Sequence, residues 1–232
     1  MKKINLVKLK NFPIYKQLLL EEALLRTDEN NWCIINEGTP PAIVMGIAGQ
    51  KENLINEDLL KRNPIPVIKR FSGGGCVIVN EDSLFITFIF SKKTHNIELF
   101  PEKIHTHMEN FYKECFQNIS LKENDYVIDQ KKCGGNAQYI KKDRWLHHTS
   151  FLWDYKKEDM DLLLLPSKQP KYRENRQHNE FLCKLKNHFS SKEEFQTKIE
   201  KNLSKHFNVE IVQQETILEK QYPVHRQRTK II

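Results

Sequence analysis

Glycine is scarce in this chain of 232 residues, and five of its eight glycines stand in two clusters, Gly73–Gly75 and Gly134–Gly135. Consecutive glycines lose much backbone entropy on folding, and a plain hairpin turn needs only one or two of them. The first cluster lies between two runs rich in Val, Ile and Phe, which are typical of strands. The pattern therefore predicts a sheet in which something approaches the backbone closely at the glycines.

The spacing of apolar residues predicts an alternation of strand-rich and helical segments. Helices are expected at 14–26, at 56–62, behind Pro101 as far as 116, and after a capping box that begins at Ser191. Strands are expected at 32–35, 42–45, 67–70, 76–79, 84–90, 126–129, 138–141, 148–154 and 209–212. This order lacks regular βαβ alternation, so it favours an α+β fold, a mixed β-sheet with packed helices. We expect one catalytic domain over residues 1–232, without a separate C-terminal accessory domain.

Composition narrows the functional classes. The chain has 37 Lys and Arg against 30 Asp and Glu, a formal charge of +7, but the two signs are interspersed along its length. This distribution favours a solvated surface over a nucleic-acid footprint, although it would attract an acidic partner. The apolar runs are too short for a membrane span, and no signal-peptide pattern is present. Five cysteines without C-x-x-C spacing fit free thiols in a cytoplasmic protein.

The segment Arg70-Phe71-Ser72-Gly73-Gly74-Gly75 combines a cation, a hydroxyl and several open N–H groups, which suit a carboxylate or a phosphate. It is neither a Walker P-loop nor a Rossmann fingerprint, because a strand follows it and the required spacing is missing. A glycine-rich bulge at a sheet corner is the structural alternative.

A second segment, Lys132-Cys133-Gly134-Gly135-Asn136-Ala137, places a lysine beside open backbone and could stabilise charge on a phosphate or acyl oxygen. Its alternative is a solvated loop lysine. His147-His148 follows at the start of an apolar strand, where adjacent side chains point to opposite faces. We therefore expect no metal site there.

Together the segments 70–77, 132–138 and 147–150 resemble three successive motifs of the biotin/lipoate protein ligase family, in its lipoate-protein ligase A-like branch. The resemblance covers roughly residues 11–188. It implies a mixed-sheet domain that activates lipoate or octanoate with ATP, and with Mg²⁺, as an acyl-adenylate. The acyl group would then pass to a lysine of an acceptor lipoyl domain, in a 2-oxoacid dehydrogenase or a glycine cleavage H-type protein.

The resemblance also implies roles for individual residues. Lys132 matches the central lysine that contacts the acyl carbonyl and phosphate oxygens. The remaining substrate-binding positions would be Arg70, Ser72, Gly73, Gly74, Gly75, Gly135, Asn136, Ala137 and His148. The sequence departs from the family pattern at Val79, at Asp82-Ser83 and at Thr149, where the family often has His, Gly-Asn and Gly.

Two alternatives remain open. An octanoyltransferase would take its acyl group from acyl carrier protein through a cysteine thioester. Cys183 is the candidate nucleophile, since Arg173, Arg176 and His178 lie nearby in the sequence and could lower its pKa; otherwise it is a packing residue in a helix. The second alternative is a non-catalytic acyl-binding protein, against which the presence of Lys132 argues.

Overall fold

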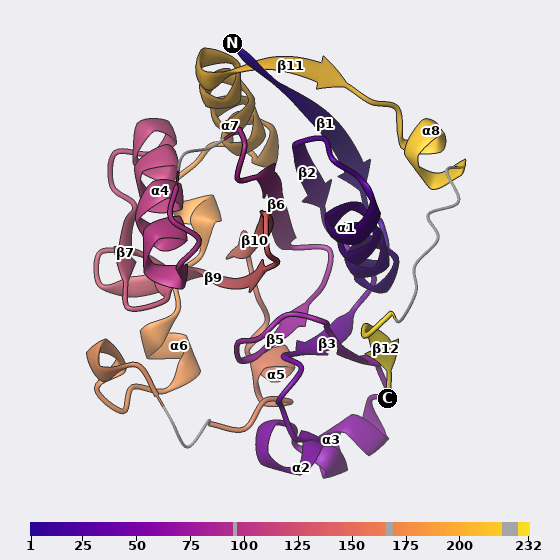
Figure 1. Ribbon diagram of the computed structural model, residues 1–232. Coiled ribbons are helices and arrows are strands. Elements are labelled where there is room, and N and C mark those ends of the chain that lie inside the picture. The colour runs from indigo at the N-terminus through magenta and orange to yellow at the C-terminus, as the bar shows by residue number, and fades with distance from the viewer. Residues whose placement is uncertain (95–96, 166–168, 220–226) are drawn as a thin grey trace.

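The computed structural model describes residues 1–94, 97–165, 169–219 and 227–232 and contains two sheets with helices packed against them (Figure 1). The larger sheet has eight strands in the order β11-β1-β2-β6-β10-β9-β8-β7. Their bounds are β1 Lys2–Lys10, β2 Trp32–Glu37, β6 Ser83–Ser91, β7 Ser120–Lys122, β8 Asp125–Ile128, β9 Lys131–Ile140, β10 Arg144–Leu152 and β11 Phe207–Ile211. β1 is parallel to both β2 and β11, while the other pairs are antiparallel. The sheet is therefore mixed, as expected for the α+β class.

The smaller sheet has four strands in the order β12-β4-β3-β5. They are β3 Ala42–Met45, β4 Val67–Lys69, β5 Cys76–Val79 and β12 Lys230–Ile231. The glycine loop at 70–75 connects β4 to β5, which both pair with β3. The first glycine cluster thus lies at the end of the small sheet.

The helices of the described ranges are α1 Ile14–Thr27, α2 Lys51–Leu54, α3 Glu57–Arg62, α4 Pro101–Cys115, α5 Lys157–Met160, α6 His178–Phe181, α7 Lys192–His206 and α8 Gln214–Glu219, with 3-10 turns η1 Lys171–Arg173 and η2 Leu185–Asn187. The long helices cover both faces of the large sheet, and α2 and α3 pack against the small sheet. α4 and α7 pack on one face through residues such as Met108 and Phe195, and α1 packs on the other through Leu24. None of the helices in the described ranges is long and apolar enough to cross a membrane.

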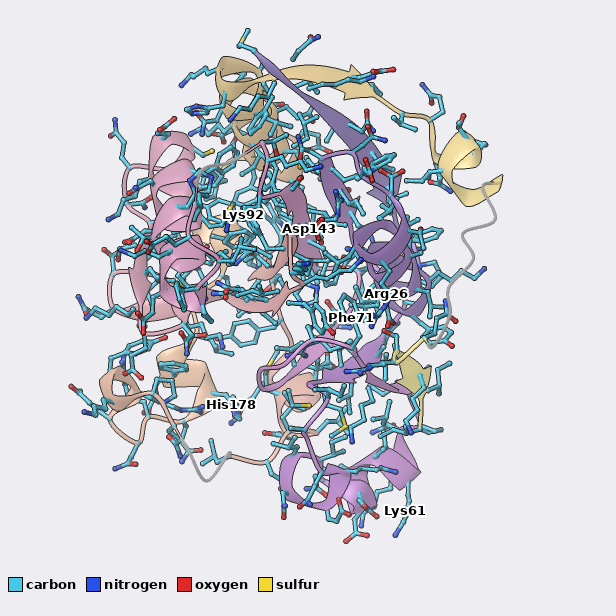
Figure 2. The ribbon with its side chains drawn as sticks, in the orientation of Figure 1. Arg26, Lys61, Phe71, Lys92, Asp143 and His178 are labelled. Carbon is cyan, nitrogen blue, oxygen red and sulfur yellow. The ribbon has the colours of Figure 1, made fainter. Side chains whose placement is uncertain are left out.

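Helix α1 contacts both sheets. Leu24 joins the cluster of Val7 and Ile34 from the large sheet, whereas Leu18 joins Val44 and Ile68 from the small sheet. Figure 2 shows side chains filling the space between the sheets and helices, with Phe71 of the glycine loop near the middle. Phe71 is fully buried in the same cluster as Leu24. Packing of α1 therefore fixes the place of the loop between the two sheets.

Most predicted elements are confirmed, but several differ from expectation. The strands β7 and β12 and the short helices α2, α5 and α8 were not predicted, and β10 begins at Arg144 instead of at residue 148. β1 was not predicted, although Ile4, Leu6 and Leu9 are buried in it, because lysines interrupt its apolar pattern. The strand predicted at 138–141 begins at Lys131, so the second glycine cluster lies within β9 instead of in a loop. A Cβ on Gly134 would come within 2.7 Å of the Phe151 ring, so glycine makes room for an aromatic side chain of β10. Lys132 is accordingly a strand residue, and the solvated-loop alternative is wrong.

The predicted capping box is half formed. Ser191 Oγ accepts a hydrogen bond from the Glu194 N–H (3.1 Å), as a helix N-cap does. The Glu194 carboxylate, however, accepts from the N–H of Ser190, one residue earlier than the motif requires (2.8 Å). The helix begins where the sequence predicts, with a different second bond.

Candidate active site

Two adjoining cavities, of about 710 Å³ and about 440 Å³, lie between the glycine loop, β9 and β10. They share part of their lining, including Gly75, Cys76, Asp125, Lys132, Gly135 and Ser150. The first cavity extends toward α1, and the second toward α6 and η1. Residues of both predicted motifs therefore form the boundary between two joined spaces.

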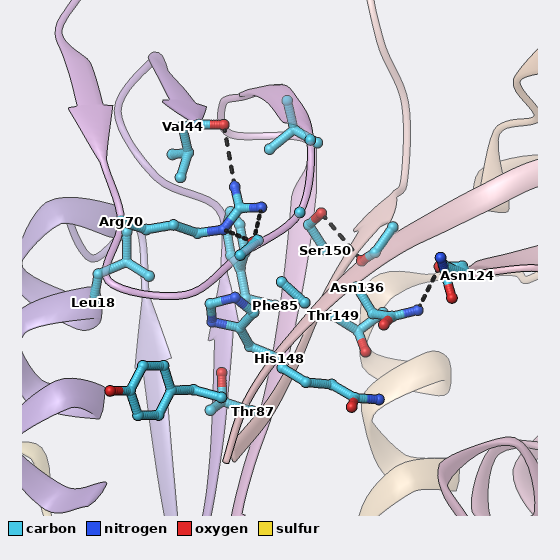
Figure 3. A pocket seen from close by; sticks show the side chains of 18 of the residues that line it. Leu18, Val44, Arg70, Phe85, Thr87, Asn124, Asn136, His148, Thr149 and Ser150 are labelled. Carbon is cyan, nitrogen blue, oxygen red and sulfur yellow. Dashed lines mark hydrogen bonds between the residues drawn. The ribbon is translucent and has the colours of Figure 1, made fainter. Parts of the chain in front are cut away.

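Arg70 holds the glycine loop from its inner side. Its Nε and Nη2 donate to the carbonyl oxygen of Gly73 (3.1 and 2.6 Å), and Nη1 donates to that of Val44 (3.4 Å; Figure 3). Gly74 has φ +95°, and a Cβ there would lie 2.6 Å from Arg70 Nη2. Burial lowers the pKa of Arg70 to about 10. Arg70, expected among the substrate-binding residues, thus holds the glycine loop in the structure.

The loop presents its glycines to the first cavity. Gly73 and Gly75 have nothing within 4 Å of where a Cβ would stand, so these positions are open. Gly74 instead faces β9, where its added Cβ would be 3.4 Å from Ala137 Cβ and 3.8 Å from the Asn136 oxygen. The two glycine motifs, separated by about 60 residues in sequence, therefore lie against each other.

A buried polar chain connects the loop to α1. Ser72 Oγ accepts from Arg70 Nε (3.1 Å) and lies 3.1 Å from His148 Nε2. The other ring nitrogen of His148 is 2.8 Å from a carboxylate oxygen of Glu21, which is fully buried. The second oxygen of Glu21 accepts from Thr87 Oγ1 (2.7 Å) and from Gln17 (2.8 Å). His148 and Glu21 line the first cavity, but Ser72 is buried behind the loop.

The adjacent histidine has a different environment, as predicted for neighbours on a strand. His147 is fully buried and its Nε2 is 3.1 Å from the Tyr126 hydroxyl. Burial, together with the neighbouring histidines, lowers its pKa well below the usual range. The chain as far as it is described holds no group of three or more His, Cys, Asp or Glu side chains placed to bind a metal ion.

Lys132 forms an ion pair at the boundary of the cavities. Its Nζ is 2.9 Å from Asp125 Oδ1, and the other Asp125 oxygen accepts from the Tyr172 hydroxyl (2.9 Å). A Cβ on Gly135 would be 3.3 Å from Lys132 Nζ, so the absence of a side chain there gives the ammonium its place. Side-chain exposures of 21% for Lys132 and 11% for Asp125 make this a partly buried pair. Burial, with the charge of Asp125 second, raises the pKa of Tyr172, which keeps its proton on the donating hydroxyl.

Asn136 is held between two elements. Its Nδ2 donates to the Asn124 carbonyl (2.7 Å; Figure 3), and its Oδ1 lies 2.7 Å from His105 Nε2 of α4. Both Asn136 and Ala137 line the first cavity, where they were expected to continue the wall. His105 also lines it and was not predicted.

The second cavity contains a buried cation. Arg173 is 4% exposed, lies 4.7 Å from the centre of the Phe181 ring, and its Nη2 has no hydrogen-bond partner in the described structure. His178 lines the same cavity and is labelled on α6 in Figure 2. A buried guanidinium nitrogen without a partner is costly unless a ligand fills the space before it. The second cavity is therefore suited to an anion.

Cys183 lines neither cavity. It follows α6, where its N–H donates to the Lys132 carbonyl (2.8 Å). A hydrogen bond from Cys133 is the main cause that lowers the pKa of its thiol, and Lys131 contributes. The expected cause, the basic residues at 173–178, is wrong. Cys76 is half-buried and lines both cavities, while Cys133 is fully buried.

Sequence reasoning missed Glu21, His105, Asp125 and Arg173. Only Glu21 carries a local signal, because it stands with Gln17 at i, i+4 among buried residues of an otherwise apolar helix face. The partners of the other three are distant in sequence.

The chain is similar in sequence to curated lipoate-protein ligases. The "Inactive lipoate–protein ligase 2" of Plasmodium falciparum is 31% identical over 251 aligned positions, 80% of this chain and 65% of that protein. Lipoate-protein ligase LplJ of Bacillus subtilis is 30% identical over 49% of this chain and 34% of its own length. The chain thus spans between a third and two thirds of these relatives.

Solved structures show the same fold. A bi-partite lipoate protein ligase from Thermoplasma acidophilum, described with its E2 lipoyl domain, superposes with a TM-score of 0.76 at 17% identity, covering 97% of this chain and 95% of that one. A lipoate-protein ligase A bound with ATP gives 0.73 at 16% identity and covers 98% of both chains. Residues 13–208, most of the chain, match the family described as the lipoyl protein ligase A/B catalytic domain, and this protein belongs to that family.

Proposed function

We propose that this protein activates lipoate or octanoate with ATP and transfers the acyl group to a lysine of a lipoyl domain. The observation that carries the proposal is the place of Lys132, whose ammonium lies over Gly135 at the boundary of two joined cavities. One cavity would hold the acyl chain and the other part of the nucleotide, so the carboxylate and the α-phosphate would meet at this lysine.

The first cavity suits an acyl chain. Leu18, Val44 and Phe85 contribute apolar surface toward α1, and the open glycines of the loop leave space beside it. At its inner side the cavity ends at the Glu21–His148 pair. A lipoyl dithiolane or an octanoyl methyl group would therefore meet this pair.

The second cavity suits phosphate. Arg173 and His178 line it, and Arg173 carries the buried nitrogen without a partner. The Mg²⁺ expected with ATP would be held by the phosphates of that substrate.

The chemistry follows in two displacements. A carboxylate oxygen of the acid attacks the α-phosphorus, the bond to the β-phosphate oxygen breaks, and pyrophosphate leaves. Lys132 would stabilise negative charge on the phosphate and then on the acyl carbonyl oxygen, and the cavity walls would shield the mixed anhydride from water. The acceptor amine then attacks the carbonyl carbon and AMP leaves. The charge of +7 favours an acceptor domain of net negative charge.

Non-catalytic acyl binding is the second candidate, because one relative is named an inactive ligase. Exchange of labelled pyrophosphate into ATP, dependent on lipoate or octanoate, separates the two. Exchange followed by a mass gain of one acyl group on an apo-lipoyl domain supports the ligase. Calorimetric binding of the acid without exchange or transfer supports the binding protein.

A separate reaction in the same experiment tests the octanoyltransferase alternative. In this reaction octanoyl acyl carrier protein replaces ATP and the free acid, and the acceptor can be a lipoyl domain or an H-type protein. Transfer from the carrier protein without any pyrophosphate exchange would replace the ligase proposal. The assay begins with this chain alone and is repeated with a second subunit, since the Thermoplasma ligase is bi-partite.

A further inference from the structure

His105 reaches the first cavity from the second turn of α4, an element outside both glycine motifs. The residue is half-buried and lines the cavity beside Pro101 and Asn124, both of which are exposed. It therefore stands where the cavity meets the surface, on the path of a side chain that enters from a partner.

The hydrogen bonds of Asn136 fix the protonation of the His105 ring. Asn136 Nδ2 donates to the Asn124 carbonyl, so the amide oxygen Oδ1 is the atom that faces His105. His105 Nε2 must then carry the hydrogen and donate it across 2.7 Å. In the neutral ring, Nδ1 holds a lone pair, and no residue in the described ranges forms a hydrogen bond with it.

The other ionisable groups of this cavity are already engaged. Glu21 accepts from three side chains, and both ring nitrogens of His148 have partners. Asp125 is paired with Lys132 and accepts from Tyr172. Of the lining residues that the structure describes, His105 is thus the one with a basic nitrogen free to accept a proton from a ligand.

The ring of His105 packs edge-on against the ring of His147, with 5.8 Å between the ring centroids, and burial keeps the pKa of His147 well below the usual range, so the His147 ring is uncharged. The cation of Lys132 lies over Gly135, the residue next to Asn136 in β9. His105 of α4 and Lys132 of β9 therefore contact neighbouring residues of β9, Asn136 and Gly135.

We propose that His105 Nδ1 accepts the proton of the acceptor lysine during acyl transfer, a role that rests on the proposed function. The lysine nitrogen forms a bond to the acyl carbon, and the bond from that carbon to the phosphate oxygen breaks, with its electron pair leaving on AMP. One proton of the attacking amine passes to Nδ1 and afterwards to solvent. Imidazole suits this step, because its protonation changes near neutral pH.

The test supplies octanoyl-AMP ready-made and compares two nucleophiles in single turnover, the lysine of an apo-lipoyl domain and hydroxylamine. Hydroxylamine is largely unprotonated near neutral pH and needs no base to free its lone pair. His105→Gln retains an amide N–H for Asn136 but has no basic nitrogen. We expect it to slow transfer to lysine by about 10²–10⁴-fold and to leave the reaction with hydroxylamine near the wild-type rate.

The matched control is His107→Gln, on the same helix but outside the cavity lining, which should react normally with both nucleophiles. Equal losses with lysine and hydroxylamine would assign His105 a structural role and overturn the proposal. Undiminished transfer by His105→Gln, or no transfer from octanoyl-AMP by the wild type, would overturn it also. Failure of pyrophosphate exchange with normal transfer from octanoyl-AMP would instead contradict only the adenylation part of the proposed function.

Discussion

Replacement of Lys132 by alanine should abolish acyl transfer, and the structure predicts a cost in stability as well. The ammonium is 2.9 Å from Asp125, whose side chain is only 11% exposed. Alanine would leave this carboxylate without its charged partner, although the Tyr172 hydroxyl would still donate to it. Loss of one partner of a partly buried polar pair costs about 1–3 kcal/mol. In a chain of this size each kcal/mol lowers the Tm by about 2–4 °C.

The catalytic loss should be much larger than this stability cost explains. Removal of one group that stabilises transition-state charge typically slows a reaction by about 10²–10³-fold. Lys132→Arg should recover little activity, because a planar guanidinium cannot take the place of a compact ammonium over Gly135. The assay is single-turnover transfer from preformed lipoyl-AMP, measured well below the Tm of every variant.

A second variant separates the two effects. In Lys132→Ala combined with Asp125→Asn, the neutral amide no longer needs a cation, so the Tm should return toward that of the wild type. Transfer should remain lost. If Lys132→Ala transferred at nearly the normal rate, or if the double variant regained activity along with its stability, the role assigned to this lysine would be wrong.

Four further changes test the geometry. Gly74→Ala should lower the free energy of unfolding by about 1–3 kcal/mol, because φ is +95° and the new Cβ would press on Arg70. Gly73→Ala, which has open space at its Cβ, should change the free energy of unfolding in urea by less than about 0.5 kcal/mol. Glu21→Ala should lower the free energy of unfolding by about 3–5 kcal/mol, since it leaves buried donors from Gln17, Thr87 and His148 unpaired. An unchanged midpoint of urea unfolding would contradict the role of Glu21 as the acceptor in this buried network. Cys183→Ser should keep transfer within a few-fold of wild type, because its thiol is outside both cavities; a loss beyond about 10³-fold with the fold intact would support a thioester mechanism. Burial alone would raise the pKa of Asp154, but hydrogen bonds from Lys184 and Lys186 outweigh it and lower the pKa to about 2. The stability that ionised Asp154 contributes is therefore present above its unfolded pKa and is lost as the pH falls through about 2. The Tm difference between wild type and Asp154→Asn should disappear over that range.

The residues that sequence analysis placed correctly are those whose role depends on the local sequence pattern. Three consecutive glycines predict an open loop, and Gly73 and Gly75 do face the first cavity. Adjacent side chains of a strand point to opposite faces, which predicts different environments for His147 and His148, and the structure places them so. The boundaries of α1 and α4 followed from Pro13, Pro101 and apolar spacing.

What sequence analysis could not predict depends on contacts between distant segments. Glu21 is recognisable as a site residue only when His148, 127 positions away, is placed beside it. Lys132 looks like a loop lysine until Phe151 is seen to occupy the space over Gly134, which permits the glycines to lie in a strand. The assignment of the hydrogen to Nε2 of His105 depends on the orientation of the Asn136 amide, which the Asn124 carbonyl determines.

The pairing of β1 with β11 cannot form until β11 has been synthesised, so it limits the order in which the strands can pair during translation. Lys2 pairs with Phe207, so one edge of β1 stays without a partner until residue 207 has left the ribosome. At about 5–20 residues per second this leaves the strand exposed for roughly 10–40 s. The partner of β4, β12 at residues 230–231, is synthesised later still. Such long-range pairing slows folding and leaves strand edges open to other chains, so this protein should depend on chaperones during translation more than its modest size suggests.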